Sequence, residues 1–431
     1  MSKKFITAGV AAFALMLTAC SSGGTTGGGS SEPAGDGAKE VGVVTWWSAG
    51  SEKEGLEALV KIFEEQNEGY KFVNKAVAGG AGSQAKQKLA ADLAAKNPPD
   101  TYQAHAGAEL SENIDAGYLQ DVSGLYDEFK LKDAFPKSLL DRLTVDGKIY
   151  SVPSNIHRSN VVWANVAVLQ EAGLDPANPP ADVDAWIADM EKVKAAGKTP
   201  ITVGMAWTQL HLFENILLAD LGAEGYSGLF NGKTDWNGEG VKKAIDHYAK
   251  ILELADKTLM NEDWEPAMKP IIEGKAAYNV MGDWALAAFN GADKKAPADY
   301  VYFAVPGTKG TFNFLADSFT LPVGAPNEAA AKAWLKTISS PEGQVAFNSI
   351  KGSIPARSDL TAEQLGKFPQ YQQDAMADFA KDTIVSSIAH GAAVPAPVSN
   401  EINDALAKFG QGASDATQLQ ADLVKATQNL K

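Results

Sequence analysis

The chain has 431 residues, a formal net charge of −15 at pH 7 and a single cysteine. This length exceeds what one hydrophobic core organises, so we expect two or three domains. The acidic balance argues against nucleic acid as a partner, because phosphate binding needs a basic surface. A single cysteine excludes an internal disulfide, so the fold must be stable through its core.

The first 19 residues have the features of a secretory signal peptide. Lys3 and Lys4 precede an apolar stretch that runs to Leu17, which is shorter than the ~20 residues of a membrane span. The segment MLTAC, which ends on Cys20, resembles the lipobox of bacterial lipoproteins, in which the cysteine is acylated and becomes the new N-terminus. The resemblance implies an extracytoplasmic protein that is lipid-anchored to the cell membrane through Cys20. The alternative is an ordinary buried cysteine.

Residues 20–40 form a Gly/Ser-rich segment with almost no apolar content. Such a composition cannot form a core and is typical of a flexible tether. A coil of this length spans on the order of 25 Å. We expect it to hold the folded part of the chain clear of a membrane surface.

From Val41 onward, strands and helices alternate. Ser51 and Glu54 have the spacing of a capping box, which predicts the start of the first helix. Strands are predicted over 41–47, 70–77, 100–106, 201–205, 276–280 and 300–305, and helices over 51–67, 83–96, 241–254 and 329–338. This alternation predicts an α/β fold with a mainly parallel sheet. No linker interrupts 41–431, which favours two lobes that share several chain crossings.

Aromatic and polar side chains gather where predicted strands end, and ligands of open α/β sheets bind beyond the carboxyl ends of their strands. These side chains are Trp46 and Trp47 with Glu52, then Gln103 with His105, then Asp283 with Trp284. Indole rings suit the apolar faces of a pyranose, and carboxylates make strong charge-assisted hydrogen bonds to its hydroxyls. A single Trp is more often core than ligand contact, since Trp is buried on average.

Several stretches carry a family resemblance in their order along the chain, from Val41 to the C-terminal region. They are TWWSAGSEKEGLEAL, AVAGGAGSQAKQKLA, PPDTYQAHAGAEL, SVPSNIHRSNVVW, WTQLHLFENILLA, EGKAAYNVMGDWA, LADSFTLP and NSIKGSIPAR. They resemble the extracytoplasmic solute-binding proteins of sugar ABC importers, with the glucose/mannose-binding branch the most similar. The resemblance implies ligand contacts at Trp46, Trp47, Glu52, Gln103, His105, Trp264, Trp284, Asp317, Lys351 and His390.

The resemblance also implies the architecture and the partners. We expect a two-lobed periplasmic-binding-protein-like fold with a ligand cleft between the lobes. Lobe 1 would comprise 41–152 and 305–350, and lobe 2 would comprise 153–304 and 351–431. The protein would be a monomer that captures a neutral sugar, glucose or mannose-like, and delivers it to the permease subunits of the importer. It would use no cofactor or metal and catalyse no reaction.

Two other functions remain open. A surface glycoside hydrolase could use Glu52, Asp283 or Asp317, a chemistry that needs two carboxylates about 5–5.5 or 6.5–9.5 Å apart. The same fold could instead bind a different small solute, such as a peptide or a polyol. His157 fits either a role in the cleft or a structural hydrogen bond.

Two weak metal patterns also occur. Residues 235–246 faintly resemble a calcium loop, although helical spacing from Val241 favours the start of a helix. His211 and Glu214 lack the second histidine of a zinc-binding helix, so no metal is expected there.

Overall fold

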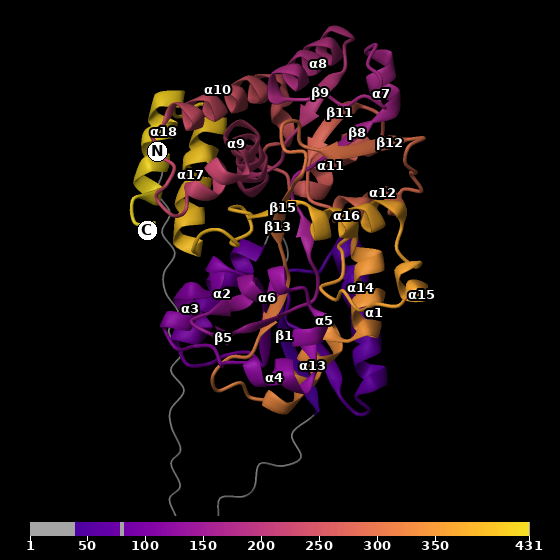
Figure 1. Ribbon diagram of the computed structural model, residues 1–431, viewed down its shortest axis with the longest axis vertical. Coiled ribbons are helices and arrows are strands. Elements are labelled where there is room, and N and C mark those ends of the chain that lie inside the picture. Colours follow the sequence, from indigo (N-terminus) through magenta and orange to yellow (C-terminus); the bar gives the residue numbers. More distant parts are fainter. Residues whose placement is uncertain (1–38, 78–81, 431) are drawn as a thin grey trace, which may run out of the picture. The chain divides into compact units, whose positions relative to one another are not determined.

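Two five-stranded sheets, each flanked by helices, form the two lobes of the chain (Figure 1). The computed structural model describes residues 39–77 and 82–430, which belong to one compact unit, Ala38–Lys431. The predicted signal peptide, Cys20 and nearly all of the predicted tether lie outside the described residues. In the part of the chain that is described, no helix combines the length and apolarity that a membrane span requires.

The sheet of lobe 1 has the order β2-β1-β3-β14-β6. Its strands are β1 (Glu40–Val44), β2 (Lys71–Asn74), β3 (Thr101–His105), β6 (Ser151–Pro153) and β14 (Asp317–Thr320). β1 runs parallel to β2 and β3, whereas β14 runs antiparallel to β3 and β6. β14 therefore closes the sheet between two strands that occur much earlier in the sequence.

The sheet of lobe 2 has the order β10-β9-β11-β8-β12. Its strands are β8 (Val161–Asn165), β9 (Thr199–Thr202), β10 (Ala255–Asp256), β11 (Ala276–Val280) and β12 (Tyr300–Ala304). β8 is antiparallel to both β11 and β12, while β9 is parallel to β10 and β11. The prediction of a mainly parallel sheet was therefore wrong. β8 and β14 each follow a crossing from the other lobe, and they enter their sheets against the direction of the neighbouring strands.

A third, three-stranded sheet lies where the chain passes between the lobes. It consists of β7 (His157–Arg158), β13 (Thr311–Leu315) and β15 (Thr383–Ser386), with β13 pairing to both of the others. Figure 1 shows β13 and β15 between the two lobes. The crossings are thus hydrogen-bonded strands, which explains why the sequence contains no linker-like boundary.

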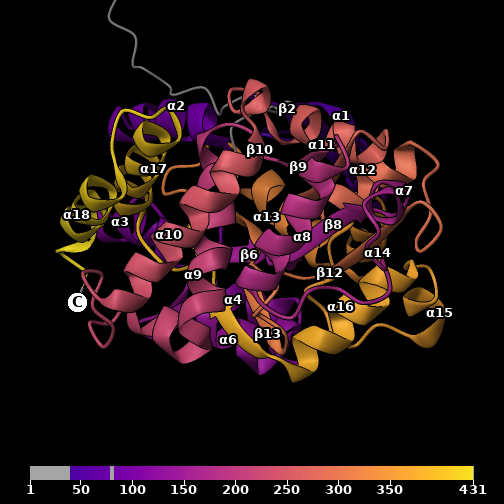
Figure 2. The ribbon, with the colours of Figure 1, turned by 90° about the horizontal axis from the view of Figure 1, so that it is seen from above.

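Helices cover both sheets. In lobe 1, α1 (Gly50–Gln66) packs on α13 (Glu328–Ser339) and α14 (Pro341–Lys351). In lobe 2, α9 (Ala206–Gly228) and α10 (Glu239–Leu254) pack on α17 (Ala396–Gly410) and α18 (Ala416–Thr427), as Figure 2 shows. The start of α10 also shows that 235–246 leads into a helix.

The other elements are short or peripheral. They are α2 (Ser83–Ala94), α3 (Ser111–Asp115), α4 (Ser123–Glu128), α5 (Leu131–Ala134), α6 (Lys137–Leu143), β4 (Thr144–Val145), β5 (Lys148–Ile149), α7 (Val166–Glu171), α8 (Val183–Ala195), α11 (Trp264–Ile272), α12 (Ala285–Gly291), α15 (Ala362–Leu365) and α16 (Gln370–Lys381).

Two local predictions were wrong: the end of the first strand at residue 47 and the capping box at the start of the first helix. β1 ends at Val44, because the side chain of Gln103 takes the next donors: its Oε1 accepts from the Thr45 hydroxyl and from the backbone N–H of Trp46. No capping box forms among the described residues at the start of α1. The helix begins at Gly50, and the Ser51 hydroxyl instead donates to Glu265 Oε1 of lobe 2 at 3.3 Å.

Candidate functional site

A pocket lies between the lobes, a common position for small-molecule sites. Nine of the ten residues expected to contact ligand line it: Trp46, Trp47, Glu52, His105, Trp264, Trp284, Asp317, Lys351 and His390. His157, Trp207, Asp263 and Leu315 complete the lining. Whether these side chains contact a ligand stays a prediction, but the fold brings them together from distant segments of the chain.

Gln103 is the predicted contact that does not line the pocket. Its Nε2 donates to Asp317 Oδ1 at 3.0 Å, and its Oε1 accepts from the N–H of Trp46 at 3.3 Å. Gln103 is 2% exposed. Gln103 therefore lies outside the pocket lining and holds two of its residues in place, through the carboxylate of Asp317 and the backbone of Trp46.

Asp317 presents an ionised carboxylate to the pocket. Asn155 Nδ2 donates to its Oδ2 at 2.8 Å, and His157 Nε2 lies 3.2 Å from the same oxygen. Burial acts to raise the pKa of Asp317, but the hydrogen bond and charge of His157, with smaller contributions from His105 and Lys351, hold it well below its usual range. Asp317 is thus a fixed acceptor, poised to take a ligand hydroxyl.

His157 lies in the pocket lining and also makes structural hydrogen bonds, so it combines features of the two roles that the sequence left open. The ring lines the pocket, yet Nδ1 is bonded to Asp283 Oδ1 and Nε2 lies beside Asp317. Burial acts to lower the pKa of His157, but the adjacent Asp283 and Asp317 raise it overall. With both nitrogens engaged, His157 acts by orienting Asp317. Asp283 is fully buried and accepts from the Arg158 N–H at 3.0 Å, so it does not line the pocket.

Glu52 and Lys351 form the second charged group of the pocket. Lys351 Nζ donates to Glu52 Oε1 at 2.9 Å and lies 5.9 Å and 5.7 Å from the ring centroids of Trp47 and Trp284. Burial raises the pKa of Glu52, and the charge of Lys351 opposes this shift. The Lys351 side chain is 2% exposed, so its ammonium depends on these partners for stabilisation.

The indole rings of the pocket have different supports. Trp47 packs on Phe347 and Phe319 in the lobe 1 core, whereas Trp46 lies 5.2 Å from the His105 ring. In lobe 2, Trp284 lies 5.2 Å from His390 and 6.4 Å from Trp207. Both lobes thus contribute aromatic walls.

Trp207 is a pocket residue that the sequence analysis missed. It lies in the first turn of α9, shortly after the carboxyl end of β9. The rule that pointed to Trp46 and Trp284 applies equally there. The signal was present in the stretch WTQLHLFENILLA.

Glu109 holds His105 in place and gives a pH-dependent prediction. Its Oε2 lies 2.8 Å from Lys86 Nζ and 2.9 Å from His105 Nδ1. Burial acts to raise the pKa of Glu109, but Lys86 and His105 outweigh it and lower the pKa from 4.5 to about 2. A lowered pKa stabilises the folded state above pH 4.5, and this contribution disappears as the pH falls towards 2.

Glu109→Gln should therefore lower the free energy of unfolding at pH 7 by at most about 3–4 kcal/mol, from 1.36 kcal/mol per pKa unit. It should also flatten the decline in stability between pH 4.5 and 2. Urea unfolding at pH 7 and pH 3 measures both effects. Equal losses at the two pH values would show that the Glu109 ion pairs do not cause the shift.

The fold and the pocket define a two-lobed solute-binding protein. The chain belongs to the family of bacterial extracellular solute-binding proteins, whose pattern it matches over residues 49–345. It is 32% identical over 433 residues to an uncharacterized ABC transporter extracellular-binding protein of Pyrococcus horikoshii, covering 99% of this chain and 96% of the relative.

Other comparisons agree. A probable sugar-binding periplasmic protein of Mesorhizobium japonicum is 32% identical over 406 residues, with 91% of this chain and 94% of the relative covered. The solved structure of a chitin oligosaccharide binding protein superposes with a TM-score of 0.79 at 21% identity, covering 91% of this chain and 98% of that one. This structural likeness establishes the two-lobed fold that the sequence predicted.

Proposed function

We propose that the protein captures a neutral sugar in this pocket, a glucose- or mannose-like monosaccharide, and delivers it to the permease subunits of an ABC importer. The observation that supports this best is the pairing of aromatic walls from both lobes with two charged groups, Asp317 and the Glu52–Lys351 pair. Indoles suit the faces of a sugar ring, and the charged groups suit its hydroxyls. The relative from Mesorhizobium japonicum, named as sugar-binding, supports the same ligand class.

The energetics are consistent with a small sugar. Micromolar binding needs about −8 kcal/mol. Charge-assisted hydrogen bonds contribute about 1.5–3 kcal/mol each, so two or three of them with aromatic burial would suffice. Discrimination among sugars would come from buried polar groups that the wrong hydroxyl arrangement leaves unpaired.

Calorimetric titration with glucose, mannose, galactose, xylose and maltose tests the proposal. We expect heat of binding and a raised melting temperature with at least one monosaccharide, because a ligand of the folded state stabilises it by mass action. A panel in which no sugar shifts the melting temperature would contradict the sugar assignment. A response to maltose alone would contradict the monosaccharide assignment.

Glycoside hydrolysis is the second candidate, and one observation favours it. The environment of the pocket raises the pKa of Glu52 and lowers that of Asp317, and separated carboxylate pKa values are a feature of acid–base pairs. Against it, Glu52 is bonded to the Lys351 ammonium, and the family consists of binding proteins. Incubation with oligosaccharides distinguishes the two, since released reducing ends would establish hydrolysis.

We also propose that Cys20 carries the lipid anchor and that the lobes move about the three crossings. Cys20→Ala should release the protein from the membrane and leave the sugar dissociation constant unchanged, since Cys20 lies before the folded unit. Membrane fractionation and calorimetry measure the two effects. A weaker affinity in the released protein would show that anchor and pocket are not independent.

A further inference from the structure

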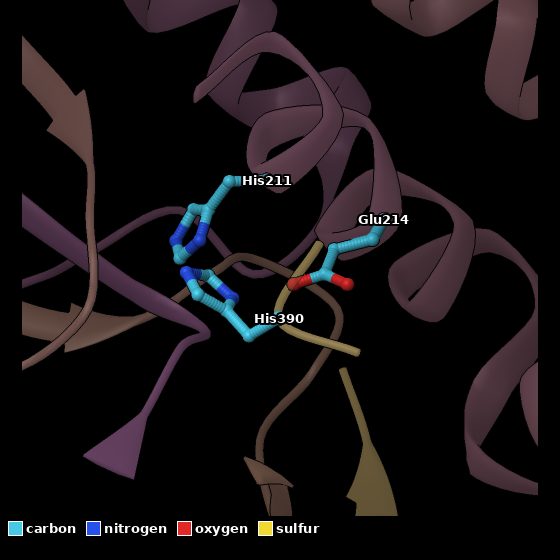
Figure 3. Close-up of side chains that lie close together, drawn as sticks. All are labelled: His211, Glu214 and His390. Carbon is cyan, nitrogen blue, oxygen red and sulfur yellow. The ribbon is translucent and has the colours of Figure 1, made fainter. Parts of the chain in front are cut away.

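Three side chains with metal-binding groups lie together beside the pocket. His211 and Glu214 are three residues apart on α9, and His390 follows β15 (Figure 3). One ligand atom from each lies within 4.8 Å of the others, and all three residues are buried. The second imidazole, which the sequence spacing lacked, is thus supplied from a distant segment of the chain.

Neither ring nitrogen of His211 makes a well-formed hydrogen bond among the described residues, although the backbone of Ser159 lies near the ring and the residue is 0% exposed. Burial lowers the pKa of His211 to about 3, so the imidazole is neutral and keeps a free lone pair. Buried polar atoms are rarely left unpaired, and an ion or a water is the usual explanation when they are. His211 therefore has at least one ring nitrogen that is available to coordinate a cation.

Hydrogen bonds hold the Glu214 carboxylate in place, yet one of its oxygens is able to coordinate a cation. Its Oε2 accepts from the backbone N–H groups of Ile388 and Ala389 at 2.6 and 3.0 Å. The closest donors to Oε1 are the hydroxyls of Ser387 at 2.8 Å and Ser159 at 3.1 Å. The hydroxyl hydrogens of the two serines can rotate away, which leaves a lone pair of Oε1 free to coordinate a cation. Oε2 keeps its backbone donors.

His390 connects the cluster to the pocket. Its Nδ1 lies 3.0 Å from Ser387 Oγ, and Figure 3 shows its ring next to that of His211, perpendicular to it, with Glu214 to one side. Burial, with the nearby His211 and His105, keeps the pKa of His390 well below its usual range. Because His390 also lines the pocket, a cation bound to its ring would change the surface that the pocket offers to a sugar.

We propose that His211, Glu214 and His390 bind one divalent transition cation of the zinc class, with a coordination position open towards the pocket. Two imidazoles and one carboxylate form the ligand set of zinc sites that keep such a position. Calcium and magnesium are disfavoured because they take oxygen ligands.

The geometry requires a small adjustment. Ligands of tetrahedral zinc lie about 3.5 Å apart given bonds of about 2.0–2.2 Å, which is less than the 4.8 Å limit of this cluster. His211 can make that movement readily, because no well-formed hydrogen bond holds its ring. His390 follows a turn that Glu214 anchors to α9, so the cluster does not depend on lobe closure.

The site predicts antagonism between cation and sugar, a part of the proposal that rests on the proposed function. A cation on His390 would occupy a ring nitrogen that could otherwise hydrogen-bond to the sugar. Each ligand should therefore lower the binding affinity of the other by the same factor. We expect a decrease in sugar affinity of at least tenfold at saturating Zn²⁺.

Titration of chelator-treated protein with Zn²⁺, and with Co²⁺ monitored by its visible absorption, tests the site without any sugar. We expect one equivalent bound, at least tenfold weaker binding in His211→Gln, and unchanged binding in His247→Gln. His247 is the matched control, because it is equally buried but pairs with Asp220 and Asp184. Circular dichroism would check that both variants are folded.

Absence of stoichiometric binding in the unaltered protein would overturn the proposal, as would equal binding in His211→Gln. Binding lost in His247→Gln alone would place the cation at that other histidine and would also overturn it. In His211→Gln, Zn²⁺ should no longer change the sugar affinity. Failure of sugar binding in every variant, with cation binding intact, would count against the proposed function only.

Discussion

Asp317→Asn should weaken sugar binding by about 2–5 kcal/mol, the range expected when one partner of a buried hydrogen-bonded charge pair is removed. This corresponds to a factor of roughly thirty to several thousand in the dissociation constant. The asparagine would retain the shape of the side chain, but it would place an NH₂ group among the donors of Gln103 and Asn155. His157 would also lose the negative charge next to its Nε2. Calorimetric titration measures the change.

Asp220→Asn is the matched control. Asp220 is also a buried carboxylate paired with a histidine, His247, and it pairs in addition with Lys243, both in lobe 2. We expect both variants to unfold more easily and only Asp317→Asn to lose affinity. If the two variants bound sugar equally well, Asp317 would be structural and the pocket assignment would fail.

Lys351→Met should have the second large effect, because it leaves the partly buried Glu52 without a cation. Breaking a buried ion pair costs about 3–5 kcal/mol, and the lower end applies because the Glu52 side chain is 20% exposed. Methionine keeps much of the apolar contact with Trp47 and Trp284, so the loss is mainly electrostatic. Urea unfolding measures the stability, and calorimetry measures the accompanying loss of sugar affinity.

The pH dependence of this variant has a definite sign. Without Lys351, burial should raise the pKa of Glu52 further above its ordinary value. A raised carboxyl pKa favours the folded state at acid pH, and this advantage disappears as the pH rises through the folded value. Lys351→Met should therefore lie closer to the unaltered protein at pH 5 than at pH 8.

Adding Glu52→Gln to Lys351→Met should recover most of the stability, since no buried charge then remains unpaired. Sugar affinity should stay low, because both members of the Glu52–Lys351 pair are gone. The exposed pair Lys332–Glu328, at 2.7 Å, is the control, and its removal should change stability by less than about 1 kcal/mol. A double variant as unstable as Lys351→Met would show that charge pairing is not the cause.

The sequence predicted the strand-end part of the pocket for a physical reason. Trp46, His105 and Trp284 each lie at or just beyond the end of a predicted strand, where the alternation of elements places ligands. The same rule would have found Trp207. Lys351 and His390 were indicated only by the family resemblance, because nothing local to either residue reveals which lobe it will face.

Other features could not be predicted from local patterns. β8 and β14 were not among the predicted strands, and hydrophobic periodicity does not reveal the direction in which a strand enters its sheet, so the mixed sheets were missed. The Ser51–Glu54 spacing indicated a capping box, but Glu265 of the other lobe takes the Ser51 hydroxyl. His211 and Glu214 were dismissed because their second imidazole, His390, belongs to another segment.

The position of β14 affects how the chain can fold as it is made. Residues 317–320 pair with both β3 and β6, so the sheet of lobe 1 stays divided until that segment has been synthesised. The strands of lobe 2 all occur before residue 305. The lobe that begins the chain therefore completes its sheet last, and such distant pairings slow folding.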